Sequence, residues 1–243
     1  MHTGQGQLFE LYYDTERAAA RILCPPRLVP APGQYLLAHD GSDAPLPVPI
    51  FQAGPAADGF LAAPPLPRAW TPGTPLHLRG PLGRGFSLPP AARRVVLLAW
   101  DGVPARLLAL LPSAFRQGAA VTLVCDLTPR DLPVEIEIQP MQALDETLAW
   151  ADFLAVDTGR EALSGLGERL GAWNQVRVEA QVLVRAEMPC GALAECGVCA
   201  VRVRNGVEGE DVEGARPLLF EGARRVGAQG LPGFLAAQLG GGG

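Results

Sequence analysis

The first ninety residues alternate short apolar runs with turns rich in glycine, proline and aspartate. Apolar and polar positions alternate within several runs, as expected where one face of a strand is buried. This spacing is typical of a small antiparallel barrel, so we predict a β-barrel over residues 1–92. The runs are residues 8–14, 19–25, 33–39, 47–53 and 75–80.

The pattern changes at Arg93, where "RRVVLLAW" (93–100) forms a continuous apolar run. Such runs are typical of parallel strands that are buried on both faces. Strand-like and helix-like segments alternate after it, which predicts a doubly wound α/β domain of the nucleotide-binding type over residues 93–175. The predicted helices are 104–118, 141–150 and 160–171, and the further strands are 119–126, 133–139 and 151–157. A last strand begins near residue 176 and leads into a cysteine loop and tail, which we treat as a third region over 176–243.

Charge and composition exclude several classes of function. The net charge of −5 argues against a nucleic-acid partner. All 20 basic residues are arginine, so neither a P-loop lysine nor a Schiff-base lysine is available. Three scattered histidines (His2, His39 and His77) give little basis for acid–base catalysis. No apolar run reaches the roughly 18 residues of a membrane span, and acidic residues interrupt the first segment, so we expect a cytoplasmic protein with no membrane partner.

The cysteine loop "MPCGALAECGVCAVRV" (188–203) holds Cys190, Cys196 and Cys199 within ten residues. A disulfide would leave one thiol over, and a zinc site would need a second pair of ligands that does not follow. The nearest template is the plant-type [2Fe–2S] loop, in which small residues let the backbone approach the cluster. An iron–sulfur cluster, another metal such as zinc, and a metal-free vestige remain open. Cys24 and Cys125 lie in apolar runs and are predicted to be buried structural thiols.

Three motifs together resemble a known family. They are "PGQYLLAH" (32–39), "GPLGRGF" (80–86) and "CGALAECGVC" (190–199). Their order resembles the electron-transfer subunit of type B dihydroorotate dehydrogenases, in the ferredoxin–NADP reductase superfamily, over nearly the whole chain. The resemblance implies an FAD between barrel and α/β domain, a [2Fe–2S] cluster, and a catalytic flavoprotein partner of pyrimidine biosynthesis. It also implies that Gly80, Pro81, Leu82, Gly83, Gly85 and Phe86 contact the flavin cofactor. Taken alone, "GPLGRGF" could simply be a turn that closes the barrel.

The cysteine loop departs from the family pattern at its fourth ligand. No cysteine follows Cys199, and aligning "RPLLF" (216–220) with the family places Glu213 where the fourth cysteine stands. We therefore predict a [2Fe–2S] site on Cys190, Cys196 and Cys199, which Glu213, water or a residue of the partner completes. A carboxylate is a harder ligand than a thiolate, so such a cluster would be labile.

The nucleotide motifs also depart from the family. The flavin-phosphate signature R-P-x-S-I reads "LPVPI" (46–50), so Leu46 replaces the arginine and Pro49 replaces a hydroxyl. Arg68 and Arg84 are candidates to replace the lost charge. The glycine-rich loop of the nucleotide domain reads "AWDGVPAR" (99–106), where Trp100 would crowd a phosphate and Asp101 would repel it. FAD binding is therefore expected to be weak, and NAD(P)H binding is not expected.

Three hypotheses follow. In the first, the chain passes electrons between a flavin and a partner oxidoreductase through the cluster. In the second, it is a non-catalytic structural or regulatory relative that has lost FAD, NAD(P)H and possibly the cluster. A third, a zinc-stabilised binding module, explains the cysteines but not "GPLGRGF".

Overall fold

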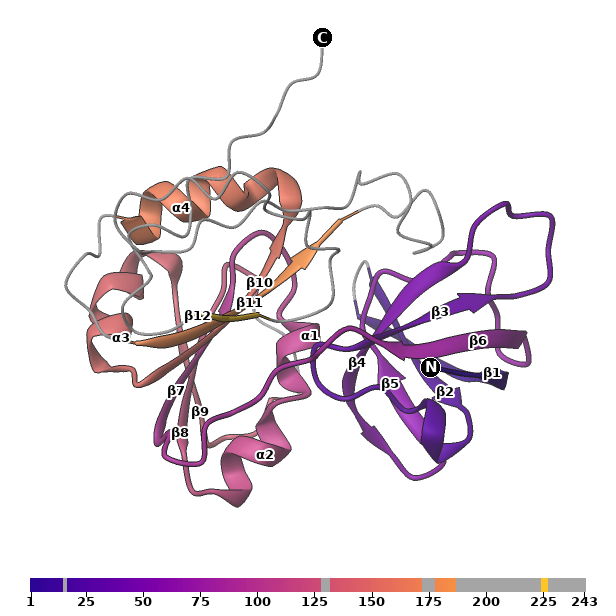
Figure 1. The fold of residues 1–243 in the computed structure, drawn as a ribbon, viewed down its shortest axis with the longest axis horizontal. Helices are drawn as coiled ribbons and strands as arrows, with labels where there is room; N and C mark the ends of the chain where they lie inside the picture. The colour runs from indigo at the N-terminus through magenta and orange to yellow at the C-terminus, as the bar shows by residue number, and fades with distance from the viewer. Residues whose placement is uncertain (15–16, 128–131, 172–177, 187–223, 227–243) are drawn as a thin grey trace, which may run out of the picture.

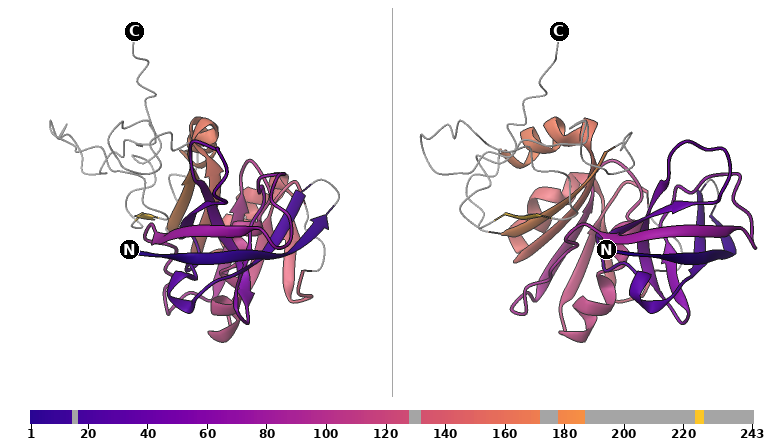
Figure 2. Two further views of the ribbon diagram at one scale, coloured as in Figure 1. Left: turned by 90° about the vertical axis from the view of Figure 1, so that its right-hand side faces the viewer. Right: turned by 45° about the vertical axis from the view of Figure 1, so that its right-hand side comes forward.

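The structure is a computed structural model that describes residues 1–14, 17–127, 132–171, 178–186 and 224–226. Figure 1 and the right-hand view of Figure 2 both show an all-β unit beside an α/β unit. The three cysteines of the loop and Glu213 lie outside the described residues.

The N-terminal unit is a closed antiparallel barrel with the strand order β1-β2-β5-β4-β3-β6. Inward side chains such as Leu8, Phe60 and Leu76 are fully or almost fully buried in its core. The predicted barrel is therefore confirmed. Its strands are β1 (His2–Asp14), β2 (Arg17–Leu23), β3 (Tyr35–His39), β4 (Val48–Ala56), β5 (Gly59–Ala62) and β6 (Pro75–Leu82).

The apolar pattern missed two parts of the barrel. Strand β1 begins six residues before the predicted run at Leu8, and its first part places Gly4 and Gly6 beside β6. Glycine carries no side chain for the alternation to show, yet it is needed here: a Cβ at Gly6 would lie 2.7 Å from the Leu23 backbone carbonyl oxygen. Strand β5 was missed because it is only four residues long.

The second unit is built on a six-stranded sheet with the order β12-β11-β10-β7-β8-β9. Strands β7 to β11 are parallel, and β12 pairs antiparallel with β11. The elements are β7 (Arg94–Ala99), α1 (Ala105–Leu108), α2 (Leu111–Arg116), β8 (Ala120–Val124), β9 (Ile136–Gln139), α3 (Leu144–Trp150), β10 (Phe153–Gly159), α4 (Leu163–Gly171), β11 (Glu179–Arg185) and β12 (Arg224–Val226). Strand β11 carries the sheet past the boundary predicted at residue 175.

Successive residues of β7 face opposite sides of the sheet. Val95 and Leu97 join the core on the side of α1 and α2, whereas Val96 and Leu98 join the core on the side of α3 and α4. Two cores on two faces require a strand buried on both sides, which explains its continuous apolar run. The doubly wound architecture is confirmed.

The helix predicted over residues 104–118 is wrong in detail, because α1 and α2 are separate short helices. Pro112 at the start of α2 has no N–H with which to continue the hydrogen-bond ladder from α1. A proline is tolerated in a first helical turn, so α2 begins here. In the described part of the chain, no helix is both long and apolar enough to cross a membrane.

The two units are joined by the segment that follows β6. Phe86 inserts into the α/β core, and Phe51 of β4 packs against the same cluster. Gln181 of β11 accepts a hydrogen bond from the Ser87 N–H at 2.8 Å and donates one to the Ser87 carbonyl at 2.8 Å. The junction is therefore a packed and hydrogen-bonded interface.

Candidate functional site

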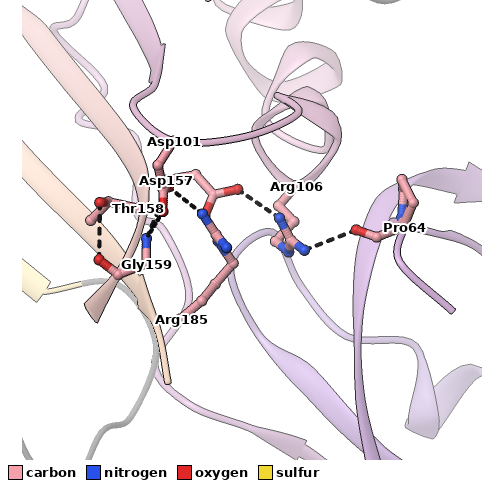
Figure 3. A network of polar contacts seen from close by, with 7 residues as sticks. All are labelled: Pro64, Asp101, Arg106, Asp157, Thr158, Gly159 and Arg185. Carbon is pink, nitrogen blue, oxygen red and sulfur yellow. Dashed lines mark hydrogen bonds and ion pairs between the residues drawn. The ribbon is translucent and has the colours of Figure 1, made fainter. Parts of the chain in front are cut away.

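Charged residues gather where three parallel strands end. Asp101 follows β7, Asp157 lies near the end of β10, and Arg185 ends β11. In open α/β sheets the carboxyl ends of the strands form the edge at which ligands bind. Figure 3 shows these side chains joined into one chain of contacts that continues through Arg106 to Pro64 of the barrel.

Asp101 ties the loop after β7 to the end of β10. Both of its carboxylate oxygens accept the Gly159 N–H at 2.9 Å, and Arg185 Nη2 pairs with Oδ1. A Cβ at Gly159 would lie 2.6 Å from Asp101 Oδ2, so the close approach depends on glycine at this position. The carboxylate therefore takes a backbone N–H that points out of the sheet edge.

Asp157 is the buried centre of the network, with 2% of its surface exposed. Its Oδ1 accepts a hydrogen bond from Arg185 Nε at 2.8 Å, and its Oδ2 accepts one from Arg106 Nη1 at 3.0 Å. Two aspartates and two arginines balance in charge. A buried carboxylate is tolerated because both of its oxygens are paired with cations.

Arg106 connects the network to the barrel. Its Nη2 donates to the Pro64 carbonyl at 2.8 Å, and its guanidinium carbon lies 5.4 Å from the centre of the Phe51 ring. Burial lowers the pKa of Arg106, and the Asp157 carboxylate opposes that shift. Within the described part of the chain, its Nε is buried without a hydrogen-bond partner. The side chain fills space between the two units.

The contacts of Asp101 favour the prediction that no dinucleotide phosphate binds at this edge. Phosphate sites of doubly wound folds offer uncapped N–H groups on a glycine-rich turn. Here the chain's own Asp101 carboxylate takes the Gly159 N–H and pairs with Arg185. Trp100 packs partly buried against the core beneath α3 and α4, and crowding of a phosphate by its ring stays a prediction. The Asp101 carboxylate is therefore an anion of the chain itself that binds these two donors.

The "GPLGRGF" loop is held by the turn that precedes β3. Gly85 has a φ of 72°, and a Cβ there would lie 2.7 Å from the Pro32 carbonyl oxygen. The Phe86 N–H donates to that same carbonyl at 2.7 Å, and Gln34 Nε2 donates to the Gly83 carbonyl at 3.0 Å. Close packing against the turn before β3 thus explains Gly85, and packing into the α/β core explains Phe86. Contact of Gly80, Pro81, Leu82, Gly83, Gly85 and Phe86 with FAD stays a prediction.

Whether Arg68 or Arg84 replaces the lost arginine of "LPVPI" stays a prediction. Leu46 is 41% exposed, and Arg68 and Arg84 are also exposed. The arginine buried at the junction is Arg106, which the sequence analysis did not single out. Pro49, paired with Leu37 across β3 and β4, offers no N–H to a ligand.

A groove of about 490 Å³ lies on the outer face of the barrel, along β1, β3 and β6. His39 is fixed beside it, because its Nδ1 accepts the Gly41 N–H at 2.9 Å and its Nε2 lies 2.8 Å from the Ala44 carbonyl oxygen. None of the predicted FAD residues lines this groove. Its lining comprises Thr3, Gly4, Gln5, Leu37, His39, Pro47, His77, Leu78 and Arg79.

The described cysteines form no metal centre. Cys125 is buried in the α/β core, as predicted. Cys24 is half-buried, and burial raises the pKa of its thiol to about 11, which keeps it protonated at neutral pH. Among the residues that the structure describes, no three histidine, cysteine or acidic side chains are close enough to hold a metal.

Asp157 and Arg185 were missed, although the sequence carries a signal for both. Each is a charged residue near the end of an otherwise apolar strand, at the edge where parallel strands place ligands. Arg106 has no comparable signal, because it follows a predicted loop and its partners come from distant segments.

Comparisons with known proteins support the fold. No protein-family model matches the sequence, and no curated protein matches it. Among solved structures, the chain is similar to an NADH-dependent reduced ferredoxin–NADP oxidoreductase studied for flavin-based electron bifurcation (TM-score 0.63, 14% identity, 82% of each chain covered). It is also similar to a cytochrome P450 reductase of Amycolatopsis (TM-score 0.58, 12% identity, 76% of this chain and 71% of that chain).

A third neighbour is the ferredoxin reductase of carbazole 1,9a-dioxygenase (TM-score 0.51, 18% identity, 64% of this chain and 59% of that chain). Each similarity covers a barrel followed by a parallel α/β domain, and none is close enough in sequence to carry an activity. The chain has the fold of the ferredoxin reductases.

Proposed function

We propose that the chain is an electron-transfer subunit that has the ferredoxin reductase fold but takes no hydride from NAD(P)H. The contacts of Asp101 support the absence of hydride transfer from NAD(P)H most directly. Its carboxylate accepts the Gly159 N–H and pairs with Arg185 at the edge of the sheet where ligands bind. Electrons would instead pass between a flavin and a partner oxidoreductase, which the sequence resemblance suggests is dihydroorotate dehydrogenase-like.

The cysteine loop supplies the relay in this proposal. Cys190, Cys196 and Cys199 would hold a [2Fe–2S] cluster by three thiolates, with Glu213 as the fourth ligand. The cluster, when bound, supplies one-electron transfer. The role of the chain is to position it and to set its exposure to the partner.

The isolated chain is expected to hold less than one FAD. A charge-assisted phosphate contact is lost at Leu46, at a cost of about 1.5–3 kcal/mol. That cost weakens binding roughly ten- to hundredfold. The flavin that exchanges electrons would then be retained best in the complex with the partner.

The second candidate is a purely structural or regulatory subunit without cofactors. The observation that favours it is Arg106, which bridges the Asp157 carboxylate and the Pro64 carbonyl across the two units. A packed junction of this kind is stable without a flavin between its halves.

Anaerobic purification with iron, acid-labile sulfide and flavin analysis separates the two candidates. The electron-transfer proposal expects iron and sulfide in a ratio of about one, consistent with the cluster formula. Cys196→Ser should abolish both, whereas the matched control Cys125→Ser should retain them. A protein that carries neither iron nor flavin after anaerobic purification and reconstitution would contradict the electron-transfer proposal and favour the structural candidate.

A further inference from the structure

Two hydrogen-bond donors converge on Asp101 at the end of β10. The Gly159 N–H reaches both carboxylate oxygens at 2.9 Å, and the Arg185 guanidinium pairs with Oδ1. A backbone N–H together with a guanidinium is a donor set that proteins use for carboxylates and phosphates. The donors come from two strands of the sheet, whereas the anion comes from the loop after a third.

The charges around these donors make the anion necessary. Asp157 is shared between Arg106 and Arg185, so one carboxylate faces two guanidinium groups. The Asp101 carboxylate balances the second positive charge. Without it, the Arg185 guanidinium, whose side chain is 27% exposed, would lose one of its two carboxylate partners, and an entering anion would restore that pairing.

We propose that Gly159 and Arg185 form an oxoanion-binding site that the chain fills with its own Asp101 carboxylate. This inference deepens the proposed function, on which it rests for the absence of a dinucleotide at this edge. It predicts that removing the internal carboxylate creates a site for a small free oxoanion.

Glu161, an exposed residue, lies near the same position. Its Oε2 lies 3.5 Å from the position that a Cβ would take on Gly159, so an entering anion faces a carboxylate as well as the two donors. A small monoanion is repelled less than a phosphate dianion. Formate and acetate, which reproduce the carboxylate that Asp101 supplies, should therefore bind better than phosphate.

The test is Asp101→Gly in the full chain, with thermal unfolding followed against added formate, acetate, phosphate or chloride at equal ionic strength. A ligand that binds only the folded state stabilises it by RT ln(1 + [L]/Kd), so the melting temperature rises with the logarithm of ligand concentration above Kd. For formate and acetate, the rise of the melting temperature with concentration should give the variant an affinity roughly ten- to hundredfold above that of the wild type, because two charge-assisted contacts become available. Chloride should have little effect.

Three matched variants define the site. Asp58→Ala breaks a surface ion pair with Arg21 that includes no backbone N–H, so it should show no carboxylate-specific stabilisation. Asp101→Gly combined with Arg185→Gln should lose the response. Asp101→Gly combined with Glu161→Gln should bind phosphate more tightly than Asp101→Gly alone.

The proposal is overturned if Asp101→Gly folds and responds to carboxylates no more than Asp58→Ala does. If Asp101→Gly does not fold, Asp101→Ala and Asp101→Ser are refolded with and without formate. Recovery only with formate supports the site, and recovery in neither condition overturns it. These outcomes are independent of iron, sulfide and NADH binding, so this inference and the proposed function can fail separately.

Discussion

Strands β7 and β10 are joined by an aspartate at each end of the pair, and the surroundings of the two aspartates differ. At the amino end, Asp152 accepts the N–H of Arg94 at 3.0 Å and that of Arg93 at 3.2 Å, and it pairs with Arg94 Nε at 3.7 Å. At the carboxyl end, Asp101 accepts the Gly159 N–H and pairs with Arg185. Each carboxylate joins the flank of one strand to the backbone of the other.

The difference lies in what surrounds each aspartate. The side chain of Arg94 is 51% exposed, so water screens the amino-end pair. Arg185 at the other end continues to Asp157, which is 2% exposed, and from there to Arg106 and the barrel. The aspartate that joins the two strands is partly exposed to solvent at the amino end. At the carboxyl end it belongs to a charge network with a buried centre. Only the carboxyl end is the ligand edge of such a sheet.

The largest effect should come from the buried centre of this network. Asp157→Asn leaves Arg106 and Arg185 without their shared carboxylate, so we expect a loss of about 3–5 kcal/mol in the free energy of unfolding. Chemical denaturation measures it. The double variant Arg106→Met with Asp157→Leu should lose much less than the sum of its single variants, and simple additivity would contradict a coupled buried pair.

The next test concerns "GPLGRGF", a motif that resembles a cofactor-binding sequence. Like the residues at the end of the sheet, it makes contacts within the chain itself. Gly85→Ala should cost about 2–4 kcal/mol in unfolding free energy, from its positive φ and its contact with the Pro32 carbonyl. Gly118→Ala is the matched control: its φ is 68°, but no atom lies within 4 Å of the added Cβ. It should cost about 1–2 kcal/mol. Equal costs would show that the close approach at Gly85 contributes nothing.

The two ends of the strand pair can be compared directly. Asp101→Ala should lower the unfolding free energy by about 1.5–3 kcal/mol, because it leaves a partly buried guanidinium and an N–H without their partner. Asp152→Ala should cost about 1 kcal/mol, because water replaces much of what is lost. A larger loss at Asp152 would reverse the comparison.

The fold was largely predictable because burial leaves a periodic trace in the sequence. The change at Arg93 from short alternating runs to continuous apolar ones marks the passage from barrel to doubly wound sheet. The hydrophobic pattern does not predict a strand whose residues include glycines, as in the first part of β1. It also fails where a helical pattern is divided by Pro112, whose missing N–H allows two short helices.

The site was predictable only in part. Asp101 stood out because a carboxylate replaced glycine in a recognisable loop, but its partners Gly159 and Arg185 come from strands far along the chain. Arg106 pairs with residues 42 and 51 positions away, and no local pattern encodes such contacts. The ligands Cys190, Cys196, Cys199 and Glu213 lie outside the described residues and stay a prediction.

The smallest expected effect concerns Cys24, which the structure places away from both aspartates. Burial raises the pKa of its thiol to about 11. The native state therefore favours the protonated thiol, and this contribution to stability is present below the unfolded value of about 8.5 and is lost as the pH rises towards 11. Alkylation of Cys24 in the variant Cys125→Ser should be slow at pH 8 and accelerate only above about pH 10. Mass spectrometry of the labelled peptide measures it, and fast labelling at pH 8 would contradict the shift.

The central claim is that the carboxyl end of the sheet is closed to dinucleotides by the chain's own charges. Isothermal titration of the anaerobically purified wild-type chain with NADH tests it most directly. The account predicts no saturable binding up to millimolar NADH, since Asp101 already occupies the Gly159 N–H and Arg185. Saturable binding with a micromolar Kd would contradict it and would mean that the edge opens to a nucleotide.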